Sequence, residues 1–528
     1  MKHFIITFKP DNKQISIHAG AALIDAAGQA GIILNTVCGG KGACKKCLVN
    51  LEPDGEEVLA CQHHIQNDLT VTIPSSSRFL EQKILEHGID TQIDLVAAVY
   101  EKYREKAAPE KIFGIAIDIG TTTVVAKLIN MADGQCHSTE ATLNPQNRYG
   151  DDVISRIAYA QNDKRLAELH KVIIDCVNDL TTKLCKKTSI EAEHIYEMCV
   201  VGNTTMNHIF LQLPVIQLGR APYKAFSLDA HDMPAAQLHI EMNPAGNIHT
   251  VENIAGFVGS DTTAVALAVD IESAEETTLV VDIGTNGELV LGAKDKLYAA
   301  SCAAGPALEG ARITCGSRAV EGAIEGVVVN EDDIDLDVIG SCPARSICGS
   351  GLIDAVAVML DLGIIDSSGR FVEPQKLLDK LPPAIFSRII ERQGEPTFVL
   401  VENEGSGMVF LTQKDIRQMQ LAKAAIRAGI RLLQKKVGLE DCDIEHILLA
   451  GAFGNYIRKE SALRVGLLPA VPVEKIRFVG NAAASGARMI LLSRHCRDKA
   501  RELARKIEYV EIAHEPEFQD VYADSMLF

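Results

Sequence analysis

Apolar and polar side chains alternate through the first 77 residues in the way that short β-strands require. The segments HFIITFKP and KQISIHA alternate on either side of Asp11–Asn12, which predicts a β-hairpin. The segment AALIDAAGQAGI has helical spacing instead, with Leu23, Ala26 and Ala30 on one side. CLVNLE and DLTVTIP predict two more strands. We therefore expect a small α+β domain over residues 1–77.

The pattern changes twice after this domain. Residues 78–110 are polar, broken by glycine and prone to form helices, and Pro109 ends the stretch, so we expect a linker with one or two helices. From residue 111 onward, long apolar strands break at glycine before a helix, as in CVVGNTTMNHIF (199–210) and LLAGAFGNYI (448–457). Strands that alternate with helices in this way predict an α/β architecture.

The large segment also repeats itself. IFGIAIDIGTTTVVA (112–126) and LVVDIGTNGELVL (279–291) each read as a buried strand, the letters Asp-Ile-Gly-Thr, and a second strand. FVGSDTTAVALA and FVGNAAASGARM each read as a strand, a glycine, polar residues and a helix, near the end of each half. We therefore predict two duplicated lobes, residues 111–272 and residues 273–528, the second with a C-terminal helix and tail.

The repeated Asp-Ile-Gly-Thr turns predict phosphate binding. A tight glycine turn lets backbone N–H groups approach a phosphate, threonine hydroxyls add donors, and the preceding Asp118 or Asp282 suits a hydrated Mg²⁺. One such turn is also a plain hairpin, but two matched copies predict a clamp around a nucleotide. Neither a Walker A nor a Rossmann glycine pattern occurs. The candidate nucleotide-binding residues are Gly120, Thr121, Thr122, Thr123, Gly284, Thr285, Asn286, Gly287, Gly451 and Gly454.

Composition narrows the function classes. Hydrophobic residues make up 47% and charged residues 23% of the chain, as in ordinary globular proteins. The formal net charge of −18 argues against nucleic acid as a partner, because phosphate backbones need a basic face. No apolar run of about 18 residues predicts a membrane span, and the start MKHFIITFKPDNK lacks the apolar core of a signal peptide. We therefore expect a cytoplasmic protein without a membrane partner.

Four of the fourteen cysteines fall within the 24 residues from Cys38 to Cys61. Cys38, Cys44, Cys47 and Cys61 have the spacing C-x5-C-x2-C-x13-C, one residue longer in the first gap than the plant-type [2Fe–2S] pattern. The glycines between them allow a loop that points N–H groups at sulfur. A zinc site usually has two paired knuckles, and one pair exists here. We favour a [2Fe–2S] cluster in a β-grasp ferredoxin domain, and buried structural roles for the other ten cysteines.

Together these motifs resemble known families. DIGTTT, DIGTNGE, GAFG and GNAAASGA are similar to the five-motif pattern of the ASKHA superfamily, which includes sugar kinases and actin. Such proteins have two duplicated α/β lobes with ATP and Mg²⁺ in the cleft. Joined to a ferredoxin domain, the arrangement resembles the reductive activators of corrinoid proteins, the RACo family. VVGNTTMNH, SCAAGPALEGA and CGSGLIDAVA resemble that family too, so the likeness covers nearly the whole chain.

The resemblance implies an ATP-dependent enzyme that passes one electron from a [2Fe–2S] cluster to the inactive Co(II) state of a corrinoid protein. This electron transfer regenerates Co(I) for methyl transfer. The transfer is uphill for an ordinary ferredoxin, and ATP would compensate. The four cysteines match the cluster ligands, and both Asp-Ile-Gly-Thr turns match the phosphate sites. The likeness also allows a homodimer and leaves the upstream electron donor open. One departure is the short interval between Cys47 and Cys61, where relatives insert a helical loop.

Three alternatives remain at this point. A small-molecule kinase or ATPase with a redox-sensing ferredoxin domain would need a catalytic aspartate, and Asp261 is the candidate, with a helix cap as its structural role. A non-enzymatic redox adaptor would have a degenerate nucleotide fold, against which both intact turns argue. An activator of radical dehydratases would hold a [4Fe–4S] cluster with lobe cysteines. The irregular spacing of those cysteines argues against it: Cys302, Cys315, Cys342 and Cys348.

Overall fold

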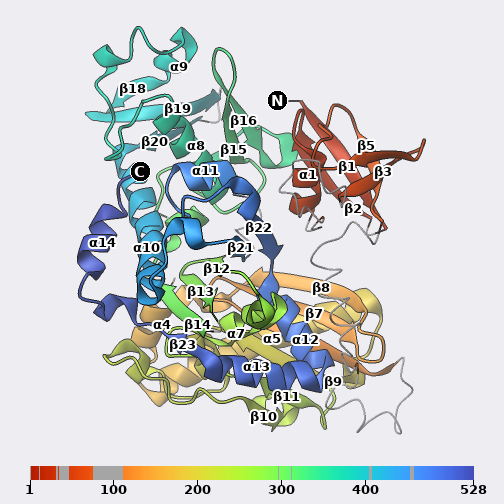
Figure 1. Cartoon of the computed structure of the whole chain (residues 1–528). Helices are drawn as coiled ribbons and strands as arrows, with labels where there is room; N and C mark the ends of the chain where they lie inside the picture. The colour runs from red at the N-terminus through yellow and green to blue at the C-terminus, as the bar shows by residue number, and fades with distance from the viewer. Residues whose placement is uncertain are drawn as a thin grey trace.

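The computed structural model describes residues 2–10, 12–30, 32, 34, 47–74, 95, 111–150, 152–294, 296–310, 312–403, 407–451 and 457–528. Figure 1 shows a small N-terminal sheet domain and a larger body with two lobes, each built on a six-stranded sheet. The predicted linker lies outside the described residues apart from Leu95. The multi-domain α/β architecture expected from the sequence is confirmed.

The N-terminal domain is a five-stranded sheet in the order β2-β1-β5-β3-β4, with one helix packed on it. Its elements are β1 (His3–Lys9), β2 (Lys13–His18), α1 (Leu23–Gln29), β3 (Leu48–Glu52), β4 (Glu56–Leu59) and β5 (Leu69–Thr72). The predicted hairpin is confirmed, because β1 pairs antiparallel with β2. Strand β4 was not predicted. It pairs with β3 across a turn at Gly55, so a complete hairpin fills the short interval between Cys47 and Cys61.

The first lobe contains the sheet β10-β11-β9-β6-β7-β8. Its strands are β6 (Phe113–Ile119), β7 (Thr123–Asn130), β8 (Cys136–Leu143), β9 (Ile195–Gly202), β10 (His231–Pro234) and β11 (Asn247–Thr250). Its helices are α4 (Val153–Tyr159), α5 (Asp163–Thr188), α6 (Thr204–Phe210) and α7 (Ser260–Ala268). Strand β6 runs parallel to β9 and antiparallel to β7, so the first Asp-Ile-Gly-Thr turn lies at the centre of the sheet.

The second lobe repeats this plan with the sheet β22-β21-β12-β13-β14-β23. Its strands are β12 (Thr278–Ile283), β13 (Gly287–Ala293), β14 (Lys296–Cys302), β21 (His446–Ala450), β22 (Ile476–Gly480) and β23 (Ile507–Tyr509). Its helices are α10 (Gln413–Val437), α11 (Lys459–Arg464), α12 (Ala482–Leu492), α13 (Arg494–Lys506) and α14 (Phe518–Asp524). Strand β12 runs parallel to β21 and antiparallel to β13, as in the first lobe.

Two small sheets extend the second lobe between β14 and α10 (Figure 1). The first has the order β16-β15-β17, and the second has the order β18-β19-β20. Their strands are β15 (Ala323–Val329), β16 (Ile334–Val338), β17 (Ser346–Ile347), β18 (Ile389–Arg392), β19 (Glu395–Asn403) and β20 (Gly407–Thr412). The helices α8 (Gly349–Asp361) and α9 (Pro383–Ser387) lie between the two sheets in the sequence. No helix in the described part of the chain combines the length and apolar composition needed to cross a membrane.

The two large sheets share an inner core. Alternate residues of β6 face opposite sides, so Ile115 and Ile117 pack under α5 while Ala116 faces inward. In β12, Val281 packs under α10 and Val280 faces inward. Helices α7, α12 and α13 fill the space between the inner faces. Because Asp118 and Asp282 continue the inward-facing series of their strands, both carboxylates point into the region between the lobes.

Helices α7 and α12 cross at van der Waals distance. A Cβ atom on Gly486 of α12 would lie 2.1 Å from the carbonyl oxygen of Ala264 in α7, so this crossing requires glycine. Helix α12 comes from the second half of the chain, yet it also packs on β6 and β9 of the first lobe. The crossing therefore ties the two lobes together directly behind the ends of β6 and β12.

The predicted strand before α7 is wrong. The backbone N–H groups of Ile254 and Ala255 both donate to the carbonyl oxygen of Val258, which closes a tight bend instead of a strand. The matching segment before α12 does form β22. Both helices are present, so the duplication includes α7 and α12. The segments that precede the two helices differ in structure.

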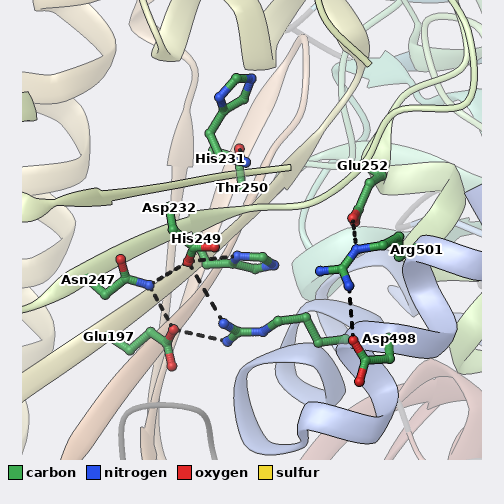
Figure 2. Close-up of polar contacts among 10 residues, drawn as sticks. Glu197, His231, Asp232, Asn247, His249, Thr250, Glu252, Asp498 and Arg501 are labelled. Atoms are coloured by element: carbon green, nitrogen blue, oxygen red, sulfur yellow. Dashed lines mark hydrogen bonds and ion pairs between the residues drawn. The ribbon is translucent and has the colours of Figure 1, made fainter. Parts of the chain in front are cut away.

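Ion pairs hold helix α13 of the second half of the chain to the first lobe. Arg497 of α13 donates to Glu197 of β9 at 3.0 Å, and the Glu197 side chain is completely buried. Figure 2 shows the surrounding contacts, in which Asn247 bridges Glu197 and Asp232, and His249 contacts Asp232. Since an unpaired buried carboxylate is costly, this contact fixes α13 on the first lobe.

We expect Arg497→Ala to lower the free energy of unfolding by roughly 3–5 kcal/mol, because it leaves Glu197 buried without its cation. Lys506→Ala is the matched control on the same helix, since the Lys506–Glu272 pair is partly exposed and worth less than about 1 kcal/mol. Denaturant unfolding of both variants measures the difference. Equal losses for the two variants would contradict the role of the buried pair.

Candidate functional site

The first Asp-Ile-Gly-Thr turn is braced from behind by three side chains. Asn144 donates through Nδ2 to the carbonyl oxygen of Gly120 at 2.9 Å. Arg156, which is fully buried, donates to the carbonyl oxygen of Thr121 at 2.5 Å. Asn203 donates to the Thr121 hydroxyl at 2.9 Å. These bonds fix the backbone of the turn before any ligand arrives, as phosphate recognition by backbone N–H groups requires.

The second turn meets the first across the cleft. The hydroxyl oxygens of Thr122 and Thr285 lie 3.0 Å apart, although the residues are 163 positions apart in the chain. Thr285 also donates through Oγ1 to Glu309 Oε1 at 2.5 Å. The structure therefore brings together the two turns that the sequence predicted as opposite sides of one phosphate site.

Three aspartates lie at the bottom of this cleft. Asp118 feels the charges of both Asp261 and Asp282, and Asn481 at the N-cap of α12 donates a hydrogen bond to it. Asp261 was considered as a helix cap, but Gly259 occupies the N-cap of α7 and Asp261 lies in the first turn. Its Oδ1 accepts from the backbone N–H of Thr262 at 2.7 Å. The acidic groups thus converge from β6, α7 and β12.

A cavity of about 510 Å³ opens between the two turns. This volume lies within the range of roughly 300–1,000 Å³ typical of small-molecule sites. It is lined by the predicted residues Asp118, Gly120, Thr121, Thr122, Thr123, Asp261, Asp282, Gly284, Thr285, Asn286 and Gly451. Sequence reasoning missed Asn203, Glu288, Glu309, Arg318, Ser350 and Asn481. Of these, Asn203 and Asn481 stand in the repeated strand-to-helix junctions, which was the available signal.

Gly451 has a steric role in the cleft. Its φ is +87°, and a Cβ atom there would lie 2.5 Å from Asp282 Oδ1. The chain therefore needs glycine where β21 passes the aspartate of the second turn. The rest of the predicted adenosine segment, including Gly454, lies outside the described residues. The role of Gly287 is also steric, because a Cβ there would lie 2.9 Å from Ile426 of α10.

Two of the predicted cluster ligands lie next to each other in the N-terminal domain. The Sγ atoms of Cys47 and Cys61 are 3.3 Å apart, at the open end of the β3–β4 hairpin, where Cys47 precedes β3 and Cys61 follows β4. This is far longer than a disulfide bond, and two thiolates at about 2.3 Å from one tetrahedral metal atom lie roughly 3.8 Å apart. The pair therefore fits a shared iron atom. Cys38 and Cys44 lie outside the described residues.

The ferredoxin-like domain contacts the second lobe. His3 of β1 pairs with Asp337 of β16, and Figure 1 shows this domain beside β15, β16 and α11. His18 of β2 lies 3.5 Å from Arg458, whose Nε is also 3.5 Å from Oδ2 of the buried Asp354. Asp354 belongs to α8, and the first turn of that helix lines the cavity. A continuous chain of contacts thus joins the cysteine-bearing domain to the cleft.

Comparisons with known proteins agree with this architecture. A family model described as the C-terminal ASKHA domain of RACo matches residues 276–528, and the RACo middle region matches residues 113–274. A 2Fe-2S iron-sulfur cluster binding domain matches residues 5–76. The corrinoid activation enzyme RamQ of Eubacterium limosum is 35% identical over an alignment of 585 positions, which covers 98% of this chain and 98% of RamQ. The chain belongs to the RACo family.

Two more relatives support the assignment. A solved structure described as a reductive activator for corrinoid, iron-sulfur protein has a TM-score of 0.73 and 32% sequence identity, and the match covers 99% of this chain and 98% of that one. The [Co(II) methylated amine-specific corrinoid protein] reductase of Methanosarcina barkeri is 26% identical over 444 residues, which cover 78% of this chain and 76% of the relative. The family resemblance inferred from the sequence is therefore confirmed.

The cleft of this RACo-family chain holds carboxyl groups with raised pKa values. Burial, with repulsion from Asp261 and Asp282, raises the pKa of Asp118 to about 8. Burial, with repulsion from Asp261, raises the pKa of Asp282 to about 7. For Asp261, burial raises the pKa to about 6, against hydrogen bonds from Thr262. Near neutral pH the empty cleft therefore retains protons that a divalent cation would displace.

These shifts predict how stability depends on pH. An unfolded chain releases its aspartate protons near a pKa of about 3.9, while the folded chain keeps the Asp118 proton up to about pH 8. Stability from this group is present at low pH and is lost as pH rises toward about 8. Without nucleotide, the melting temperature of the parent chain should fall between about pH 5.5 and pH 8. In Asp118→Asn we expect this fall to be smaller by at least about 2 °C.

The exposed Asp379→Asn is the control for this measurement, and it should leave the pH profile of the melting temperature as it is in the parent chain. Asp379 lies outside the cleft, so the difference between the two variant profiles reports Asp118 together with its coupling to Asp261 and Asp282. An Asp118→Asn profile parallel to that of the parent would show that Asp118 is ionised in the empty cleft.

Proposed function

We propose that this chain is an ATP-dependent reductive activator, which passes single electrons to the inactive Co(II) state of a corrinoid protein and so regenerates Co(I). The observation that carries the proposal is the combination, in one chain, of a 2Fe-2S domain with a two-lobed cleft, matched along 98% of its length by a corrinoid activation enzyme. A cytoplasmic location and a homodimer stay predictions from the sequence.

Charge in the cleft supports a nucleotide bound together with Mg²⁺. The described lining contains five carboxylates, Asp118, Asp261, Asp282, Glu288 and Glu309, and one cationic side chain, Arg318. A triphosphate entering this lining without a cation would meet several acidic groups and a single arginine. Mg²⁺ prefers one or two carboxylates, retained waters and substrate phosphates, and Asp118 and Asp282 are placed at the ends of the strands to hold such a hydrated ion. The braced threonine turns would then donate to the phosphate oxygens.

The cysteine pair supports a [2Fe–2S] cluster as the electron carrier. Cys47 and Cys61 would hold one of its sides, and the cluster would supply one electron at a time. The protein's own task is to keep these thiolates at fixed positions, which the β3–β4 hairpin does by pairing Leu48 with Leu59 between them. Cys38 and Cys44 complete the proposed ligand set.

The contact between the domains gives ATP a way to influence the electron carrier. Arg458 and Lys459 begin α11, directly after the predicted adenosine segment, and their charges act on Asp25 of α1. In α1, the backbone N–H groups of Leu23 and Ile24 donate to the carbonyl oxygens of residues 63 and 60, on either side of Cys61. A nucleotide that moved α11 would therefore move charges that face the cysteine-bearing domain.

We expect two substitutions to separate the electron-carrying and nucleotide-binding roles in an anaerobic assay of Co(I) formation from a Co(II) corrinoid protein, followed by its visible spectrum. Cys61→Ser should abolish both the EPR signal of the reduced cluster and Co(I) formation. Asp282→Asn should keep the EPR signal but slow ATP-dependent Co(I) formation by about 100-fold, because a charged group of the phosphate site is lost.

The exposed Cys442→Ser is the control, and both readings should match those of the parent chain. A parent chain with a reduced cluster and ATP that phosphorylates a metabolite and yields no Co(I) would favour the kinase alternative. If Asp282→Asn forms Co(I) as fast as the parent chain does, the two-lobed cleft does not take part in the reaction.

A further inference from the structure

Glu309 is held on a rigid platform at the edge of the cleft. It ends a short 3₁₀ turn, Pro306–Glu309, which follows β14. Within the turn, Ala307 and Leu308 are buried in the core of the second lobe. After it, Gly310 has a φ of +80°, and a Cβ there would lie 2.0 Å from the carbonyl oxygen of Ser317. The backbone therefore has little freedom on either side of the Glu309 carboxylate.

The hydrogen bonds of the two turns have a definite direction. The Thr285 hydroxyl donates its proton to Glu309 Oε1. The Thr285 oxygen then accepts from the Thr122 hydroxyl, which lies 3.0 Å away. These two hydrogen bonds hold the Glu309 carboxylate beside the place where the two phosphate turns meet. Oε1 is occupied, and the described residues record no partner for Oε2, which leaves that oxygen for a water molecule.

The other carboxylates of the described lining suit a different task. Asp118, Asp261 and Asp282 converge from β6, α7 and β12, and burial raises the pKa of all three. Glu288 lies on β13, where burial and repulsion from Asp261 raise its pKa well above the usual range. Groups that hold a cation or a proton are poor acceptors for a second proton. Glu309 is the lining carboxylate that is bonded to a phosphate-turn hydroxyl instead of being grouped with other acids.

We propose that Glu309 is a catalytic residue of ATP hydrolysis, the general base that orients and deprotonates the attacking water. The inference rests on the proposed function, since it takes ATP as the ligand of the cleft. The water oxygen forms a bond to the γ-phosphorus, and the bond between that phosphorus and the bridging oxygen breaks. Its electron pair leaves with ADP. The water proton passes to Glu309 Oε2 and is returned to the released phosphate.

Glu309→Gln tests the assignment without disturbing the turns, because the glutamine carbonyl still accepts from Thr285 while it cannot take up a proton. With the full chain, a reduced cluster and Mg²⁺–ATP, we expect kcat for phosphate release to fall about 100-fold or more. The dissociation constant for ATP should change less than about threefold. Glu309→Asp keeps a carboxylate on a shorter side chain, so its kcat should lie between those of the parent chain and Glu309→Gln. Glu373→Gln, an exposed glutamate of the same lobe, is the control.

The pH profile supplies a reading that a structural role would not move. In Glu309→Gln, kcat should rise in proportion to hydroxide concentration, whereas kcat of the parent chain should not follow hydroxide concentration. Hydrolysis by Glu309→Gln within threefold of the parent, or a loss of hydrolysis that follows a loss of ATP binding, overturns the assignment, as does a parent chain that never releases phosphate.

Measuring phosphate release with and without a corrinoid protein keeps this test apart from that of the proposed function. If the parent chain hydrolyses ATP and Glu309→Gln does not, the assignment stands even where no Co(I) forms. If Co(I) forms with both proteins and phosphate release is equal, the activator function stands and Glu309 is not the base.

Discussion

The crossing of α7 and α12 determines the geometry on which the site depends. At Gly486 the two helices approach so closely that no side chain fits between them and Ala264. Because α7 follows the first sheet and α12 follows the second, their contact sets how far apart the two sheets lie. That separation places Thr122 and Thr285 at hydrogen-bond distance and gathers Asp118, Asp261 and Asp282.

A second constraint ties the chain into one unit. Helix α13 returns to the first lobe through Arg497, which pairs with the buried Glu197, 300 residues away. Strand β23, immediately after α13, pairs with β14 of the second lobe. The last part of the chain therefore spans both lobes behind the cleft. On the opposite side, His3, His18 and Arg458 join the ferredoxin-like domain to the second lobe. A change in the cleft thus has physical routes to the electron carrier.

Much of this was accessible from the sequence because it is encoded locally. The repeated Asp-Ile-Gly-Thr turns, the hairpin of β1 and β2 and the glycine-rich cysteine pattern are all local signals of a few residues. Strand β4 escaped prediction because its four residues, Glu56–Leu59, are half acidic and gain their strand conformation from pairing with β3. The bend at Val258 replaced a predicted strand because one carbonyl accepts two local bonds.

The contents of the site were harder to predict where they depend on distant partners. Glu309 stands in a segment without a phosphate motif, and its orientation comes from Thr285, 24 residues earlier. Arg156 reaches the first turn from α4, and Arg497 reaches β9 from the far end of the chain. Long side chains that pair across the fold leave no periodic trace in the sequence. Asp118 and Asp282 could be predicted because each begins a copy of the repeated Asp-Ile-Gly-Thr turn.

We propose that nucleotide in the cleft enables an electron transfer to Co(II) that the cluster alone cannot complete. The most direct measurement holds the full chain and a Co(II) corrinoid protein in an anaerobic cell, poised at a potential where the cluster is reduced and the cobalt is not. For a one-electron couple, the ratio of oxidised to reduced form changes tenfold for about every 59 mV, so the applied potential sets the fraction of reduced cluster and of reduced cobalt. We expect Co(I) to appear when Mg²⁺–ATP is added. Co(I) that forms equally without ATP, or never forms with ATP while the cluster stays reduced, would contradict it.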